Sequence, residues 1–190
     1  TQKGYDINLF RGNELDVMGR FIAAANQYNI DIIVRVTGDN PFVDPRFLDE
    51  VINYFCLKKD DVVKIDNLPL GMGLEVFSLN TLKKAKKLAL DPNQSEYMTS
   101  YLFRSSYFKT HRYTPIAHNK DYSHIRLTVD YPEDLQLCQI ICRLLSTHLF
   151  SFEDLINLFE EYPTLVNINS NVKMIPLPRI LFADDPPPSD

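Results

Sequence analysis

Residues 31–44 read DIIVRVTGDNPFVD, and most of the fold prediction rests on this stretch. Its first half is short, mostly apolar and β-branched, which is typical of a strand buried on both faces of a parallel sheet. Gly38 and Pro41 then end the strand, because glycine permits a sharp turn and proline cannot continue a ladder. Asp39 is therefore predicted at the carboxyl end of a central strand, the edge where open α/β sheets bind ligands. A simpler interpretation stays open, in which Asp39 and Asn40 only form the turn.

The chain has 190 residues, a length that suits one domain with a sizeable core. Its net charge of −5 and isoelectric point of about 5.4 give no support to a nucleic-acid-binding surface. The sequence has no apolar run of the roughly 18 residues that a membrane span needs, and its first residues do not resemble a signal peptide. The three cysteines are few and odd in number, which favours a reducing, cytoplasmic location.

Helical and strand patterns alternate along the chain. The patterns predict helices over residues 13–28, 45–57, 81–90, 93–105, 132–147 and 152–160. They predict strands over 31–37, 61–65, 74–77 and 124–130, with a further short strand at 7–10 and a strand or loop at 111–118. This order indicates an α/β fold with a mostly parallel sheet flanked by helices. We expect a single domain over residues 1–175 and a C-terminal tail over 176–190.

A second aspartate, Asp130, repeats the local design around Asp39, since each follows an apolar strand and precedes a helix that starts with proline. Strands of one parallel sheet deliver their carboxyl ends to a common edge, so the two carboxylates could share one hard cation. Mg²⁺ suits this arrangement, because it takes one or two carboxylates and fills its shell with water and phosphates. The pattern points to phosphoryl or nucleotidyl transfer. Alternatively, Asp130 only caps the helix that follows it.

Four segments carry a resemblance to a known family. They read FRGNELDVMGR at 10–20, IIVRVTGDNPFVDPRFLDEVINYF at 32–55, GMGLEVFS at 71–78 and RLTVDYPEDL at 126–135. Together they resemble the spore-coat polysaccharide biosynthesis branch of the cytidylyltransferases, which are relatives of acylneuraminate and ketodeoxyoctonate cytidylyltransferases. Each segment alone is a loose motif, but their order and spacing are specific. The resemblance implies a nucleotide-diphospho-sugar transferase fold with a Rossmann-like mixed sheet.

The resemblance also implies a reaction, in which CTP and an acidic sugar give a CMP-sugar and pyrophosphate with Mg²⁺ as cofactor. By position, Asp39 and Asp130 match the catalytic aspartates that hold the metal. Four further residues match positions near the nucleotide or the sugar: Arg35, Asn40, Glu75 and Arg126. The sugar hydroxyl would attack the α-phosphate in line, and the sequence assigns no general base. Because relatives are often dimers, a homodimer is a further expectation.

The sequence departs from the family pattern in two places. The phosphate-binding loop of the form R-x-P-x-K, which the resemblance would place before these segments, does not occur in the sequence as given. We therefore expect an N-terminally truncated or degenerate relative that is inactive alone. Glu96-Tyr97 also stands where Glu-His is usual. Two other functions stay open: a non-catalytic binding or assembly module, and a glycosyltransferase of the same fold, against which the sequence Asp39-Asn40-Pro41 counts because such enzymes usually carry Asp-x-Asp there.

Overall fold

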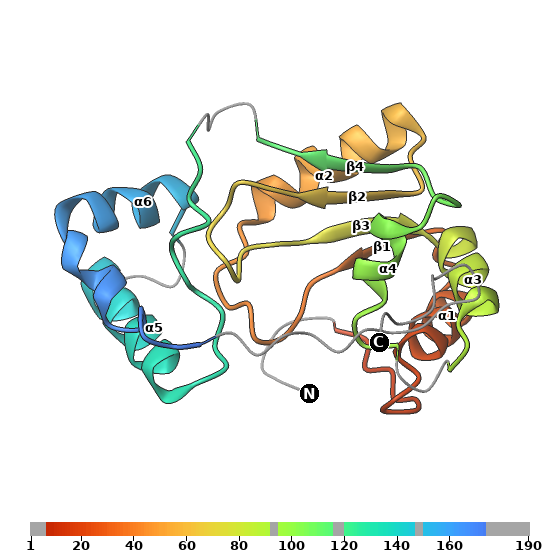
Figure 1. The fold of residues 1–190 in the computed structure, drawn as a ribbon, viewed down its shortest axis with the longest axis horizontal. Helices are drawn as coiled ribbons and strands as arrows, with labels where there is room; N and C mark the ends of the chain where they lie inside the picture. The colour runs from red at the N-terminus through yellow and green to blue at the C-terminus, as the bar shows by residue number, and fades with distance from the viewer. Residues whose placement is uncertain (1–6, 92–94, 116–119, 147–149, 174–190) are drawn as a thin grey trace, which may run out of the picture.

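A computed structural model of the chain describes residues 7–91, 95–115, 120–146 and 150–173. The described strands form one sheet in the order β1-β3-β2-β4 (Figure 1). They are β1 Ile32–Arg35, β2 Val62–Ile65, β3 Glu75–Ser78 and β4 Thr110–Tyr113. β3 is antiparallel to both of its neighbours, whereas β2 and β4 are parallel. β1, β2 and β4 therefore share one direction, and β3 alone opposes them.

Helices flank this sheet, so the predicted α/β fold is confirmed. They are α1 Val17–Tyr28, α2 Pro45–Lys58, α3 Leu79–Leu88, α4 Met98–Arg104, α5 Pro132–Leu145 and α6 Phe152–Glu161, followed by the 3-10 turn Pro163–Asn167. Figure 1 shows α2 behind the sheet and α4 in front of it. α1 and α3 lie at one end of the sheet, and α5 and α6 lie beyond the other end. No helix among the described residues is long and apolar enough to cross a membrane.

Alternate residues of the strands face two separate hydrophobic clusters, as the pleat of a sheet requires. Val63 and Val76 belong to the cluster on the α2 side, together with Phe47, Val51 and Phe55 of α2. Val62 and Phe77 point to the opposite face. There they join a second cluster with apolar residues of α1, α3 and α4: Met18, Ala25, Leu79, Leu82, Ala85, Met98, Tyr101 and Leu102. The sheet is thus the middle layer of three.

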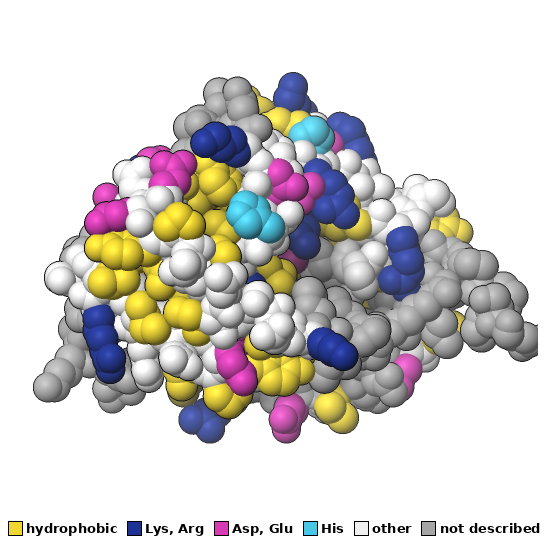
Figure 2. Space-filling model, turned by 60° about the vertical axis from the view of Figure 1, so that its left-hand side comes forward, with side chains coloured by type: hydrophobic (Ala, Val, Ile, Leu, Met, Phe, Trp, Pro, Cys, Tyr) yellow, Lys and Arg dark blue, Asp and Glu magenta, His cyan; other side chains and the backbone are white. Residues whose placement is uncertain are grey.

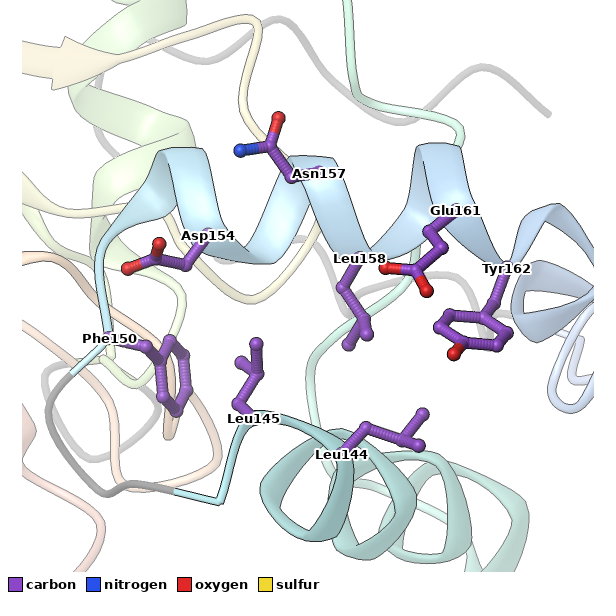
Figure 3. Close-up of a pocket in the computed structure, with 8 residues that line it drawn as sticks. All are labelled: Leu144, Leu145, Phe150, Asp154, Asn157, Leu158, Glu161 and Tyr162. Carbon is purple, nitrogen blue, oxygen red and sulfur yellow. The ribbon is translucent and has the colours of Figure 1, made fainter.

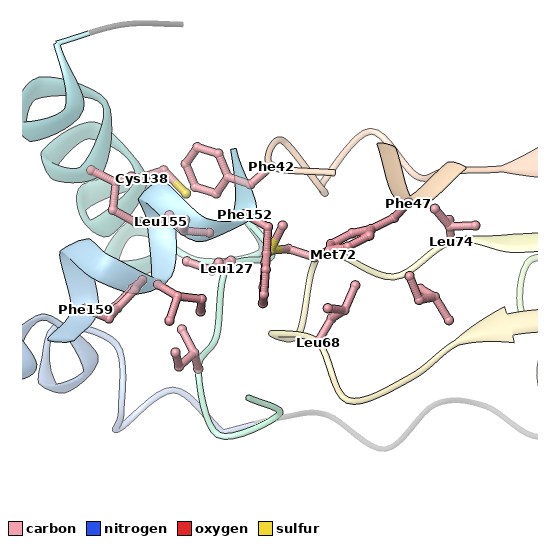
Figure 4. Packing of buried hydrophobic residues seen from close by; sticks show 14 of the residues in the cluster. Phe42, Phe47, Leu68, Met72, Leu74, Leu127, Cys138, Phe152, Leu155 and Phe159 are labelled. Atoms are coloured by element: carbon pink, nitrogen blue, oxygen red, sulfur yellow. The ribbon is translucent and has the colours of Figure 1, made fainter. Parts of the chain in front are cut away.

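The cluster on the α2 side continues past the sheet to α5 and α6 (Figure 4). Phe47 of α2 packs edge-on against Phe152 of α6, with ring centroids 5.3 Å apart. Leu68, Met72 and Leu127 bring two loops into the same cluster. The C-terminal helices are therefore anchored on loops that leave the sheet, and these loops also line the candidate site.

Asp44 joins the first turns of α2 and α6. It is the N-cap of α2, which starts at Pro45 as predicted, and one carboxylate oxygen accepts a hydrogen bond from the Arg46 amide at 2.9 Å. The other oxygen accepts one from the Phe152 amide at 2.9 Å, 108 residues further on. Burial acts to raise the Asp44 pKa, but the hydrogen bonds from Arg46 and Phe152 outweigh it and lower the pKa. One carboxylate therefore satisfies first-turn amides of two helices, which have no partner within their own helix.

The structure corrects the prediction for the first strand. β1 pairs with β3 alone among the described strands, so it lies at the edge of the described sheet and not in its centre. Ile32 is 38% exposed, so the prediction of a strand buried on both faces is wrong at this residue. The direction of β3 also differs from a parallel sheet, because β3 returns from β2 through a short loop, and such a connection places neighbouring strands antiparallel.

Other predicted elements also differ from the structure. Residues 7–10 form no strand, and the side chains of Ile7 and Leu9 are largely exposed. The predicted strand at 124–130 is an extended segment with one parallel bridge, between Arg126 and Leu70. α3 begins two residues earlier than predicted, because Ser78 caps it and its side chain accepts a hydrogen bond from the Thr81 amide. α4 is shorter than the predicted helix, and the predicted C-terminal tail lies outside the described residues.

Candidate active site

A cavity of about 970 Å³ opens where the loops after β1 and β2 meet the extended segment before α5. Residues 37–40 form one wall, residues 64–71 another, and the segment between 121 and 130 a third. All six side chains that the sequence singled out line this one cavity: Arg35, Asp39, Asn40, Glu75, Arg126 and Asp130. The structure therefore brings together residues that lie up to a hundred positions apart, as a site at one edge of the sheet requires.

Asp39 and Asp130 face the same hydroxyl group. The Thr128 Oγ1 atom lies 3.3 Å from Oδ2 of Asp39 and 3.5 Å from Oδ2 of Asp130. The two carboxylates and the hydroxyl form a donor set made only of oxygen, which suits a hard divalent cation. No group of three or more His, Cys, Asp or Glu side chains in the described ranges could hold a metal. Two carboxylates fit an ion that takes its remaining ligands from water and phosphates.

Backbone hydrogen bonds hold the loop of Asp39 against the segment that carries Thr128. The Val129 amide donates to the Asp39 carbonyl oxygen at 2.9 Å. Within the loop, the Asn40 amide donates to the Thr37 carbonyl oxygen at 3.1 Å, which closes the predicted turn. Gly38 lies in this turn, but its φ is not positive and a side chain there would meet open space. The turn therefore does not depend on the conformational freedom of glycine.

Gly71 is the glycine on which the site depends. The Leu70 carbonyl oxygen accepts hydrogen bonds from the amides of Leu127 and Thr128, at 2.6 and 3.0 Å. Gly71 has a φ of 99°, and a Cβ atom at this position would lie 2.2 Å from the Thr128 nitrogen. Only glycine combines that backbone conformation with such a close approach. Gly71 therefore allows the loop after β2 to support the residue that connects the two carboxylates.

Arg126 holds Asp130 in position. Its guanidinium donates from Nη2 to Oδ2 of Asp130 at 2.7 Å. It also forms a two-pronged contact with Asp134, through Nε at 2.8 Å and Nη2 at 2.9 Å. The hydrogen bond with Asp134 is the main cause of the raised Arg126 pKa. With its side chain 12% exposed and its Nε and Nη2 atoms donating to carboxylates, Arg126 fixes the Asp130 carboxylate at the cavity wall.

Asp134, and not Asp130, caps α5. Its Oδ2 atom accepts hydrogen bonds from the amides of Asp130 and Tyr131, both at 3.1 Å. The Asn169 side-chain amide donates to its Oδ1 atom at 2.8 Å. Burial acts to raise the Asp134 pKa, but the hydrogen bonds from Arg126, Asn169 and the two amides outweigh it and lower the pKa to about 2. Asp134 thus leaves the Asp130 carboxylate directed toward Arg126 and Thr128.

Arg35 and Glu75 form an ion pair inside the cavity. They are register partners on β1 and β3, and Nη1 of Arg35 lies 3.0 Å from Oε2 of Glu75. Their side chains are 15% and 12% exposed. Arg35 also donates to the Glu96 carbonyl oxygen at 3.4 Å. Glu75 therefore lies on the cavity side of the sheet, and its carboxylate is held in one orientation.

Several residues of the site were not predicted from the sequence. Thr128 lies two positions before Asp130 in an extended segment, so the two-residue period of such segments could have indicated that both side chains share one face. Lys64 lines the cavity from β2, and a charged residue in an otherwise apolar strand is a signal that could have indicated it. Asn169 contacts Asp134 across 35 residues of sequence, and no local pattern indicates it.

Other surfaces suit a nucleotide less well. A hollow of about 410 Å³ lies between α5 and α6 (Figure 3), where Leu144, Leu145 and Leu158 line it beside Asp154 and Glu161. Its described lining holds no lysine or arginine that could bind phosphates. On the face that Figure 2 shows, the described acidic and basic side chains are interspersed and form no continuous basic stripe. The cavity around Asp39 is therefore the candidate active site.

Comparisons with known proteins show the family to which the chain belongs. The model of the cytidylyltransferase family matches residues 1–162. The chain is 34% identical over 168 residues to an uncharacterized protein of Methanocaldococcus jannaschii. That match covers 88% of this chain and 69% of the other protein. It is 33% identical over 129 residues to the spore coat polysaccharide biosynthesis protein SpsF of Bacillus subtilis. That match covers 67% of this chain and 54% of SpsF.

The fold also has a close match among solved structures. A cytidylyltransferase from Leptospira borgpetersenii serovar Hardjo-bovis superposes with a TM-score of 0.79 at 29% sequence identity. The match covers 90% of this chain and 71% of the Leptospira chain. The similarity thus extends over most of the α/β fold.

Proposed function

The chain belongs to the cytidylyltransferase family, and we propose that it transfers CMP from CTP to an acidic sugar, with release of pyrophosphate. Family membership and the similarity to SpsF support a nucleotidyltransferase of polysaccharide biosynthesis. The observation that carries the finer proposal is the shared contact of Asp39 and Asp130 with Thr128 at the wall of a 970 Å³ cavity. A cavity of this size suits a nucleotide together with a small second substrate.

The proposed cofactor is Mg²⁺, held by Asp39 and Asp130. When bound, it neutralises charge on the phosphates and on the departing pyrophosphate. Arg126 orients Asp130 through the contact at 2.7 Å, so its role is positioning and its effect on phosphates is indirect. Asn40, beside Asp39 in the turn, lines the same cavity wall and can donate hydrogen bonds from its side-chain amide to a phosphate or sugar oxygen.

The proposed reaction is an in-line displacement. A sugar hydroxyl oxygen forms a bond to the α-phosphorus of CTP while the bond from that phosphorus to the pyrophosphate oxygen breaks. The hydroxyl proton leaves to solvent, and pyrophosphate carries away the electron pair. The Arg35–Glu75 ion pair lines the same cavity from β1 and β3, whereas Asp39 lies in the loop after β1, so we assign the pair to contacts with the sugar or the nucleoside. Positioning and charge neutralisation supply most of the rate in such reactions.

The test is product analysis with labelled CTP. The protein is incubated with CTP carrying ³²P at the α-phosphate, Mg²⁺ and a panel of 2-keto sugar acids. Labelled CMP-sugar and equimolar pyrophosphate, both stopped by chelation of the metal, would support the proposed reaction and would show that the expectation of a protein inactive alone is wrong. Conversion of a nucleotide-sugar donor in place of CTP would instead establish the glycosyltransferase. Calorimetry with CTP and Mg²⁺ is the companion measurement, and an absence of heat at millimolar CTP would favour a non-catalytic module. A homodimer and a cytoplasmic location stay predictions.

A further inference from the structure

A row of charged side chains crosses one face of the sheet, with one residue on each strand. Arg35 of β1 is the register partner of Glu75 on β3, Glu75 is the partner of Lys64 on β2, and Lys64 is the partner of Arg112 on β4. All four side chains line a cavity of about 380 Å³ between the sheet and α4. The row therefore runs positive, negative, positive, positive across the sheet.

The charges in this row do not balance. Glu75 is engaged by Arg35 at 3.0 Å, which leaves Lys64 and Arg112 side by side. Arg112 approaches Asp66 at 3.6 Å, but this pair is on the solvent side, with 57% and 39% of the two side chains exposed. Lys64 is partly buried, and its side chain makes no ion pair or hydrogen bond within the described part of the chain. Like charges directly opposite each other on neighbouring strands are unfavourable, so this end of the row lacks an anion.

The remaining charges around the cavity do not supply that anion. Glu96 and Arg104 also line it, one acidic and one basic, so they leave the excess of positive charge unchanged. The cavity is thus lined by four basic and two acidic side chains. Arg112 also lies over the ring of Phe103, 5.1 Å from its centroid, which holds the guanidinium against α4. This contact orients the Arg112 guanidinium, although 57% of the side chain is exposed.

A buried hydroxyl without a partner lies beside this charge. Thr99 of α4 is 8% exposed and lines the same cavity. Its Oγ1 atom is buried and has no hydrogen-bond partner in the described structure. Buried polar groups are nearly always paired, so an exception needs an explanation. Threonine in a helix populates two χ1 rotamers, and rotation can turn this hydroxyl toward the cavity that its side chain lines.

We propose that Lys64, Arg112 and Thr99 form a subsite for the carboxylate of the sugar substrate. The two cations would bind the two carboxylate oxygens, and the Thr99 hydroxyl would donate to one of them. The subsite opens into the candidate active site, because five residues line both cavities: Arg35, Lys64, Glu75, Glu96 and Tyr97. The identity of the ligand rests on the proposed function, whereas the unbalanced row of charges does not. The subsite would let the protein select acidic over neutral sugars.

The test uses inorganic sulfate as a charge probe and amide chemical shifts of the 22.0 kDa protein as the readout. We expect saturable shifts at Lys64 and Arg112. We expect the variants Lys64→Met and Arg112→Met each to weaken sulfate binding by about tenfold, the effect of losing one charge-assisted hydrogen bond. Lys87→Met, at an exposed position on α3, is the matched control and should bind as the wild type does. Equal affinity in all three variants would overturn the proposal.

A second arm identifies the ligand. N-acetylneuraminate should displace sulfate, and its C1 methyl ester, which lacks the charge, should not. Displacement by both compounds, or by neither, would overturn the assignment of a carboxylate. Calorimetry with CTP separates this inference from the proposed function. Binding of the carboxylate without binding of CTP would contradict the cytidylyltransferase proposal alone. Binding of CTP, together with unchanged carboxylate affinity in Lys64→Met, would contradict the subsite alone.

The variant Thr99→Val distinguishes a ligand role from a packing defect. Valine has the shape of threonine without the hydroxyl, so the variant should fold and should melt at a higher temperature, because the unpaired buried group is gone. If the hydroxyl binds the anion, the same variant should also bind sulfate several-fold more weakly than the wild type. A higher melting temperature with unchanged sulfate affinity would show that Thr99 has no part in the subsite.

Discussion

The amide of Val129 donates a hydrogen bond to the carbonyl oxygen of Asp39 at 2.9 Å. This bond joins the loop after β1 to the segment before α5. Next to it, the Thr128 hydroxyl approaches the Asp39 carboxylate across 89 residues of sequence. The backbone and the side chain of Asp39 are thus both fixed by one short segment, and that segment also carries Asp130. The separation of the two carboxylates is therefore set by main-chain hydrogen bonds.

Replacing either carboxylate should abolish metal-dependent nucleotide binding. The variants Asp39→Asn and Asp130→Asn keep the shape of the side chain but remove the charge that a divalent cation requires. We expect each to weaken Mg²⁺-dependent CTP binding by at least about tenfold, measured by calorimetry. Asp49→Asn, at an exposed position on α2, is the control and should bind as the wild type does. If Asp39→Asn binds CTP and Mg²⁺ normally, the metal assignment is wrong.

Gly71→Ala should destabilise the protein and disturb the site together. A methyl group at this position would meet the Thr128 nitrogen at 2.2 Å, and the φ of 99° adds strain. We expect a loss of about 2 kcal/mol or more in the free energy of unfolding, measured with urea. Gly73→Ala, where a side chain would meet open space and φ is not positive, should change that free energy by less than about 1 kcal/mol. Similar losses in both variants would contradict the close approach at Gly71.

Asp134 should make the free energy of unfolding vary with pH in the acid range. Its pKa in the folded protein is about 2, below the ordinary value of 3.8, so the folded state holds the ionised form more strongly than the unfolded state does. The resulting stabilisation is full above about pH 5 and is lost as the pH falls toward 2; its size is about 2 kcal/mol. Asp134→Asn should remove this part of the slope. Urea unfolding of the wild type and of Asp134→Asn between pH 2 and 6 measures this difference. If the free energy of unfolding depends on pH equally in the two proteins, the prediction is wrong.

The Arg35–Glu75 ion pair should show a measurable coupling energy. Both side chains are largely buried, so removing one partner leaves an uncompensated charge in the cavity. We expect Arg35→Gln and Glu75→Gln each to destabilise the protein by about 1–3 kcal/mol, and the double variant to lose less than the sum. A double-mutant cycle of urea unfolding gives the coupling directly. Strict additivity would show that the 3.0 Å contact contributes nothing to stability.

Local signals predicted much of the fold because local chemistry determines those elements. Asp44-Pro45 starts α2 as predicted, since an N-cap and a first-turn proline act within a few residues. The start of α5 at Pro132 has the same cause. The sequence did not reveal that β3 lies between β1 and β2, because strand neighbours are chosen by contacts between distant segments. It also indicated a strand at 124–130, where a single bridge to Leu70 forms in place of a ladder.

The candidate site was predictable to a similar extent. Strand ends and a family resemblance were sufficient to single out Asp39 and Asp130, and the structure places them in one cavity. Their partners were not predictable, because each partner depends on three-dimensional arrangement. Arg126 was assigned to the substrates, yet its guanidinium engages Asp130 and Asp134. Lys64 becomes noteworthy only when the sheet register puts it beside a second cation.

Asp44 links the unfolding of two helices that lie far apart in the sequence. Its carboxylate accepts one hydrogen bond from an amide in the first turn of α2 and one from an amide in the first turn of α6. Fraying of either turn therefore exposes the carboxylate that caps the other turn. The two helix starts should therefore open in a single cooperative unit, although more than a hundred residues separate them. In native-state hydrogen exchange, the Arg46 and Phe152 amides should show the same opening free energy. In Asp44→Ala, both amides should exchange early and together, and α6 should be the first helix to detach.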